Sequence, residues 1–249
     1  MPPYDRTGKY AQWDEARRAE SHYNTRLRAV ARQVDQIIRG LAPNGVVKNL
    51  STLLRSLEGY AELIEPWAVS VAQYMLSDVR RRNERIWKAN GMAMAKALRA
   101  ETEQSEHGQV YRDLMQDQVQ LITSIPRVAA ERVHKLTDEA RYTGRRAEDI
   151  AQEILAIGRV STSRARLIAR TEVGRTSSVF MQARAQSVGS EGYIWRTVKD
   201  ADVRPTHRKM EGKYVRWSHP PKTDPGLDPY HAGCGPNCRC FPEPVLPDF

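Results

Sequence analysis

The sequence predicts an α+β protein, with a mainly helical N-terminal region at residues 1–160 and a small C-terminal α+β module at residues 161–249. Three observations lead to this prediction. Apolar residues recur at helical spacing up to about residue 190, and short aromatic and β-branched runs follow them. Beyond Trp217, proline and glycine become so frequent that we expect the module to end in a turn-rich loop.

The first helices are predicted from apolar residues three and four positions apart. This spacing covers residues 23–41 and 46–64, and Pro66 begins a third helix. The charged stretch 78–88 interrupts the apolar pattern, and the Asn-Gly pair at 90–91 predicts a break.

After this break, residues 90–101 return to strong helix formers. Four further helices are expected, at residues 110–122, 124–141, 147–158 and 161–189. Pro126 is placed in the first turn of the second of these, where its missing N–H costs nothing. The last two end on glycine, which is typical of a helix C-terminus.

Two strands are predicted in the module, in the runs GYIWRTVKD (192–200) and GKYVRW (212–217). Both are rich in aromatic and β-branched residues and are bounded by glycine and charged residues. Helices followed by strands, rather than alternating with them, favour the α+β class.

The charge and cysteine content narrow the class of protein. Lys and Arg total 39 against 30 Asp and Glu, which gives a formal net charge of +9 and favours contact with a polyanion or an acidic protein. An odd number of cysteines, three, favours a reducing compartment over a disulfide-built secreted domain. The first twenty residues lack a secretory leader, and no apolar run approaches the roughly 20 residues of a membrane span. We therefore expect a soluble protein with no membrane partner.

Two basic helix faces are candidates for nucleic-acid contact. Arg81, Arg85 and Lys88 share one face, and Arg166 and Arg170 share another. Such stripes can lie along phosphates without reading the base sequence, although many are simply solvated faces.

All three thiols lie within HAGCGPNCRC at residues 231–240. Cys234, Cys238 and Cys240 could supply three zinc ligands, with His207 or His231 as the fourth. The alternative is a structural corner in which reduced cysteines pack as small apolar groups. Because no CxxC pair is present and a large arginine separates the last two cysteines, we expect the corner, with no bound cofactor. An HNH nuclease would need a metal-binding helix after the cysteines, where the chain is rich in proline.

The ARTE segment raises the question of an enzyme. Arg170 and Glu172 are two positions apart on a predicted helix, so their side chains diverge by about 200° and do not converge on one ligand. An ion pair of Glu172 with Arg175 or Arg164 is the structural alternative. We expect no enzyme, while ADP-ribosyl transfer remains the enzymatic alternative.

Three segments taken together resemble a known family. ARTE at 169–172, WRTVKDADVRPTHRKMEG at 195–212 and GPNCRC at 235–240 are similar, in order and spacing, to the C-terminal domain of the phage Mu F-like head morphogenesis family. The positions carried over are Arg170, Thr171, Glu172, Trp195, Asp200, Asp202, Arg204, His207, Gly212, Cys238, Arg239 and Cys240.

This resemblance implies a minor head (capsid) protein of a tailed phage, inside the head near the portal and in the host cytoplasm during assembly. Its implied partners are the portal protein, through the helical region, and the scaffold or major capsid protein. Non-specific contact with packaged double-stranded DNA, and a part in its release, are also implied. A plain DNA-binding module stays open as an alternative.

Within the module, charge-assisted pairs are expected to hold the corner. Asp202 and Arg204 are suited to such pairing, and Arg239 is a second fork-shaped donor that can tie a loop back. We therefore expect the cysteine segment to close onto the strand that carries Trp195. Some relatives have a CxxC pair where this chain has Thr206 and His207, which makes a metal site less expected here.

Overall fold

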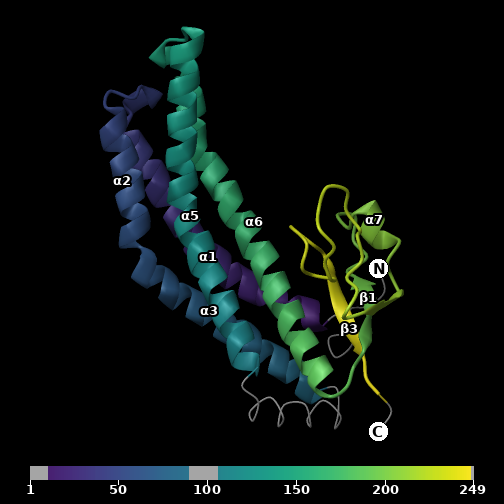
Figure 1. The fold of residues 1–249 in the computed structure, drawn as a ribbon. Helices are drawn as coiled ribbons and strands as arrows, with labels where there is room; N and C mark the ends of the chain where they lie inside the picture. The colour runs from purple at the N-terminus through teal and green to yellow at the C-terminus, as the bar shows by residue number, and fades with distance from the viewer. Residues whose placement is uncertain (1–10, 90–105, 248–249) are drawn as a thin grey trace. The chain divides into compact units, whose positions relative to one another are not determined.

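The computed structural model describes residues 11–89 and 106–247, and in them it confirms a mainly helical α+β protein (Figure 1). None of the described helices combines the length and apolar character that a bilayer span requires. The helices are α1 (Ala11–Leu41), the 3-10 turn η1 (Pro43–Gly45), α2 (Leu50–Leu63), α3 (Glu65–Ala89), α5 (Glu106–Thr143), α6 (Ala147–Ser187) and α7 (Pro205–Arg208), and the strands are β1 (Gly192–Thr197), β2 (Tyr214–Arg216) and β3 (Cys240–Val245).

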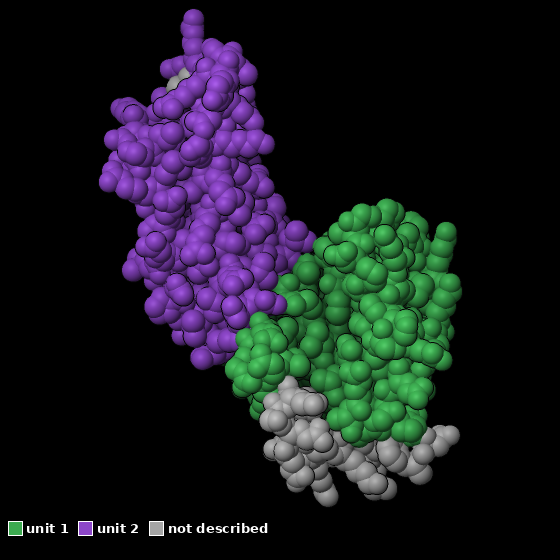
Figure 2. All heavy atoms as spheres, viewed as in Figure 1, with its two compact units in different colours: residues 1–21, 74–114, 170–249 green, residues 22–73, 115–169 purple. Residues whose placement is uncertain are grey.

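The chain divides into two compact units, each built from separate stretches (Figure 2). Unit 1 contains residues 1–21, 74–114 and 170–249, and unit 2 contains residues 22–73 and 115–169. Helix α6 continues through residue 160, where the sequence predicts a domain boundary. Whether residues 1–160 fold by themselves stays a prediction.

Unit 2 is a helical core of aliphatic side chains. The apolar face predicted from the spacing of residues 23–41 is buried over most of its length, at Tyr23, Leu27, Val30 and Val34. At its end the core contains Ile38 and Ala42, whereas Ile37 and Leu41 are only partly buried. Asn49 caps α2 by accepting a hydrogen bond from the Thr52 N–H at 3.0 Å. The fully buried aliphatic residues of this unit include Leu27, Val34, Ile38, Leu53, Leu57, Ile122, Val133 and Ile154.

Two of the predicted breaks between helices are wrong, one at residues 122–124 and one at residue 158. Helix α3 includes the charged stretch and ends at Ala89, and the break predicted at 90–91, like the helix expected after it, lies outside the described residues. The helices predicted at 110–122 and 124–141 are one helix, α5, with Pro126 in its interior. The hydroxyls of Thr123 and Ser124 bond to carbonyls of the preceding turn, at Val119 and Leu121, next to the position where proline lacks a donor.

Gly158 does not end a helix but lies inside α6. A Cβ at this position would come within 2.0 Å of Asp35 Oδ1 and 2.8 Å of Asp35 Cβ. The glycine therefore permits a close approach of α6 to α1 within unit 2. Gly189, with a φ of +84°, follows the end of α6 as the sequence predicts.

The sheet lies in unit 1 and has the order β2-β1-β3, with both pairs antiparallel. The two predicted strands are confirmed as β1 and β2, whereas β3 falls in the segment expected to be irregular. Pro242 and Pro244 are tolerated because β3 is an edge strand. The N–H of Val198, the residue after β1, donates to the carbonyl of Arg239. Backbone groups alternate along a strand, so those of Pro242 and Pro244 point away from β1, toward the open edge.

An aromatic core covers this sheet. Trp87 donates to Met181 Sδ at 2.8 Å, and the rings of Tyr193 and Trp217 lie 4.4 Å apart. The same buried cluster includes Trp195, Val215, Ala232, Cys238 and Cys240.

Candidate metal centre in the C-terminal module

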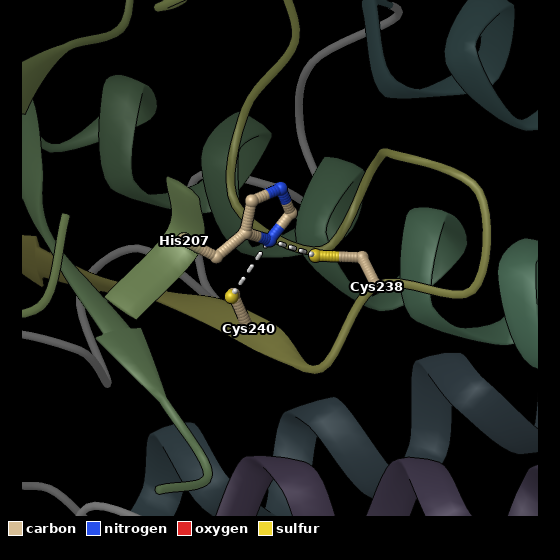
Figure 3. Close-up of side chains that lie close together, drawn as sticks. All are labelled: His207, Cys238 and Cys240. Carbon is tan, nitrogen blue, oxygen red and sulfur yellow. Dashed lines mark hydrogen bonds between the residues drawn. The ribbon is translucent and has the colours of Figure 1, made fainter. Parts of the chain in front are cut away.

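His207, Cys238 and Cys240 converge at one buried point of unit 1, although they come from different segments (Figure 3). His207 lies on the single turn of α7, which a loop of residues 198–204 connects to β1. Cys240 begins β3, opposite Thr197 of β1. Cys238 lies two positions before the start of this strand, and both sulfurs face the His207 imidazole, whereas the Arg239 side chain reaches Asp200. The arginine between the cysteines therefore does not separate them.

The geometry at this point is compact. The Nδ1 atom of His207 lies 3.3 Å from Cys240 Sγ and 3.5 Å from Cys238 Sγ. All three ligand atoms lie within 4.8 Å of one another, and all three side chains are buried. The Trp195 ring packs edge-on against the imidazole, with ring centroids 5.5 Å apart.

A chain of hydrogen bonds orients the imidazole from its other side. His207 Nε2 lies 3.0 Å from the Tyr230 hydroxyl, which donates to Asp224 Oδ2 at 2.5 Å. Arg204 pairs with the same carboxylate, and Thr206 donates to its second oxygen at 3.0 Å. Since the tyrosine proton goes to Asp224, the Tyr230 oxygen accepts the Nε2–H of His207.

The two thiols of the cluster differ in acidity. Contact with Cys240, and then with His207, lowers the pKa of the Cys238 thiol against the opposing effect of burial. The same contact with Cys238, together with burial, raises the pKa of the Cys240 thiol. The pKa values of the two neighbouring thiols are therefore shifted in opposite directions.

The other two candidate zinc ligands lie apart from this group. Cys234 is not among the three converging residues, and burial raises the pKa of its thiol to about 12. His231 uses both ring nitrogens elsewhere, with Nδ1 3.2 Å from the Tyr193 hydroxyl and Nε2 3.1 Å from the Trp217 carbonyl. The structure therefore brings together three of the four residues of the zinc set named from the sequence.

Arg239 ties the corner down as expected, through a carboxylate. Its guanidinium forms a two-pronged contact with Asp200, with Nε 2.9 Å from Oδ1 and Nη2 bonded to Oδ2. Asp202 lies 3.6 Å from Arg239 Nη1, and the guanidinium lies over the Trp13 ring. Asp202 and Arg204 thus pair with different partners, because Arg204 reaches Asp224 and the Pro236 carbonyl.

The ARTE segment contacts the cysteine loop directly. Arg170 Nη1 donates to Asn237 Oδ1 at 3.1 Å, and the Thr171 hydroxyl accepts from the Asn237 N–H at 2.9 Å. Arg170 also donates to Glu20, at 3.3 Å. The Glu172 carboxylate accepts from Arg175 Nε at 3.0 Å, which is the ion pair expected as the structural alternative. These contacts explain why the segment and the loop occur together in one motif.

Gly212 completes the turn before β2. Its φ of +78° is a left-handed conformation that favours glycine, and its N–H donates to the Trp195 carbonyl at 2.9 Å. The preceding Glu211 accepts from the Thr197 N–H at 2.6 Å, which fastens this turn to β1.

Most of the arginines of the two basic faces are engaged in ion pairs. Arg85 lies 3.1 Å from Glu15, Arg81 lies 3.7 Å from Asp78, and Arg170 pairs with Glu20. The exposed Arg166 has no ion pair within the described ranges. The side chain of Lys88 lies outside the described residues.

Sequence reasoning missed Tyr230 and Asp224, which position His207. Both lie in the proline-rich stretch after Trp217, where no periodic pattern marks a buried side chain. The segment TDPGLDPY carries a turn signal at its Asp-Pro-Gly, but that signal says nothing of which side chain turns inward.

Comparison with known proteins agrees with the motif. Residues 131–242 match the model of the family described as Phage Mu protein F like protein. An uncharacterized protein of Haemophilus influenzae is 32% identical over 128 residues, which are 51% of this chain and 28% of that relative. The chain thus corresponds to less than a third of the relative's length, and no solved structure matches it. All the motif positions fall within 131–242, so the resemblance is confirmed, and this chain contains a Phage Mu protein F-like region.

Proposed function

We propose that this protein is a minor head protein of a tailed phage and acts in head morphogenesis. The observation that carries the proposal is the match of residues 131–242 to the Phage Mu F-like family. The motif side chains support a structural role, because their hydrogen bonds join separate segments of unit 1. Arg170 and Thr171 hold Asn237, and Arg239 holds Asp200.

We further propose that the protein lies inside the head near the portal and docks on the portal protein through its helical region. The scaffold or major capsid protein is the second proposed partner. This placement rests on the family match, which begins at residue 131 and so leaves most of the helical region unmatched.

Non-specific contact with packaged DNA, with a part in its release, is a secondary proposal supported by the net charge of +9. The ion pairs of Arg85 and Arg170 reduce the charge that these faces offer to phosphates. We therefore expect binding to duplex DNA that weakens steeply with salt. Binding that persists at about 0.3 M salt would instead favour a dedicated DNA-binding module.

The experiment that tests the proposal is deletion of the coding sequence from the phage, with complementation in trans. We expect defective or unfilled heads, normal tails, and recovery of infectious particles with the wild-type protein. Filled and infectious heads at normal yield without the protein would contradict the proposal. Turnover of NAD by the purified protein would favour the enzymatic alternative, ADP-ribosyl transfer.

A further inference from the structure

We propose that His207, Cys238 and Cys240 bind a zinc ion that stabilises the C-terminal module. The inference does not depend on the proposed function, and it departs from the corner without metal that the sequence leads us to expect. In the described ranges, these residues form a group of three side chains whose ligand atoms lie within 4.8 Å of one another. Nitrogen and thiolate sulfur are the ligands that zinc prefers in structural sites.

The interatomic distances fit a metal centre. With zinc bonds of about 2.3 Å to sulfur and about 2.0–2.1 Å to nitrogen, a tetrahedral angle separates the two ligand atoms by roughly 3.6 Å. The observed separations of Nδ1 from the two sulfurs are 3.3 and 3.5 Å. The three side chains therefore need little movement to reach a common ion.

One imidazole nitrogen does not account for both sulfur contacts. Nδ1 has a single in-plane site, which holds either a lone pair or a proton, so it makes one linear hydrogen bond. Two sulfurs nevertheless face it from Cys238 and Cys240 (Figure 3). An ion between the three atoms uses the one lone pair of Nδ1 and both sulfurs at once.

The bonds of the histidine's other nitrogen support the same conclusion. The Tyr230 hydroxyl donates its proton to Asp224, so its oxygen accepts the hydrogen bond from His207 Nε2–H. In a neutral imidazole with the proton on Nε2, the lone pair is on Nδ1, which faces the sulfurs. Metal-binding histidines commonly donate their second N–H to an oxygen in this way, which fixes the tautomer and the ring orientation. Asp224 is itself held by Arg204 and Thr206.

Binding is balanced by the loss of two thiol protons to solvent as the sulfurs become thiolate ligands. The three protein ligands leave one tetrahedral position, which we assign to a water molecule. Cys234 is outside the set, because it does not converge with the other three ligand atoms. This gives a matched control, since Cys234 is a cysteine of the same loop.

The test uses the full chain, purified under reducing conditions without chelator. Elemental analysis is expected to find about one zinc ion per chain. Cys238→Ser and Cys240→Ser should lose most of the metal, whereas Cys234→Ser should retain it. Equal loss of zinc in Cys234→Ser and Cys238→Ser would overturn the ligand assignment.

A second measurement needs no variant, so it holds even if the serine variants fail to fold. Zinc is stripped from the wild-type protein with a chelator, and cobalt(II) is added. We expect a sulfur-to-cobalt charge-transfer band together with the visible bands of a tetrahedral ion, and a melting temperature that falls on stripping and recovers with zinc. Far less than stoichiometric zinc in the purified protein, with no charge-transfer band after cobalt addition, would overturn the proposal.

Discussion

Replacing Arg239 with alanine is expected to destabilise the C-terminal module. In the structure this guanidinium makes a two-pronged, charge-assisted contact with Asp200 and lies 5.6 Å from the centroid of the Trp13 ring. The Arg239 side chain is 15% exposed and that of Asp200 is 33% exposed, so solvent screens the pair only in part. The substitution removes both contacts and leaves the Asp200 carboxylate without its main partner.

The magnitude follows from these contacts. Hydrogen bonds to charged groups contribute about 1.5–3 kcal/mol, and the partial exposure of Asp200 favours the lower half of that range. The aromatic contact adds about 0.5–1 kcal/mol at most. We expect a loss of about 2 kcal/mol in the free energy of unfolding, which for a chain of this length lowers the melting temperature by roughly 4–8 °C.

The assay is a double-mutant cycle in chemical denaturation, with Arg239→Ala, Asp200→Ala and the double variant. Because the two side chains contact each other, their effects should be non-additive by about 1 kcal/mol or more. Arg216→Ala is the matched control, since Arg216 is exposed on β2 and its side chain has no partner among the described residues. Its effect should stay within about 0.5 kcal/mol. Additivity of Arg239→Ala and Asp200→Ala within about 0.3 kcal/mol would refute the reasoning.

Two further predictions concern packing and pH. Gly158→Ala should destabilise unit 2, because the added Cβ would meet Asp35. Gly59→Ala should instead stabilise helix α2 by about 0.5–1 kcal/mol, because no atom lies within 4 Å of the added Cβ. Equal melting temperatures for the two variants would contradict the close approach at Gly158. Burial lowers the pKa of His231 below its usual 6.5. The unfolded chain therefore takes up a proton at this residue before the folded protein does, so the free energy of unfolding decreases as the pH falls below about 6.5. His231→Gln should therefore show a smaller loss of melting temperature than wild type between about pH 7 and pH 5, and parallel curves would count against this role of burial.

Local patterns were sufficient to predict the class of fold and two of the three strands. The helical face of α1 and the aromatic runs of β1 and β2 follow directly from residue spacing. The errors arise where tertiary packing overrides a local signal. Pro126 lies inside α5, and Gly158 lies inside α6 because of a contact with Asp35 that is distant in sequence.

The candidate site was predictable in its residues but not in its arrangement. The histidine and the cysteines were named from the sequence, yet only the pairing of β3 with β1 brings Cys240 near His207. Strand β3 contains two prolines, and prolines normally argue against a strand. They are tolerated here because β3 lies at the edge of the sheet. The positioning residues Tyr230 and Asp224 carry no local signal that relates them to His207.

Quantitative mass spectrometry can compare purified virions with heads assembled without the portal protein. We expect the protein in virions at low copy number relative to the major capsid protein, and we expect its loss from heads that lack the portal. Absence of the protein from virions would contradict a role as a minor head protein, and equal amounts in both kinds of head would contradict docking on the portal.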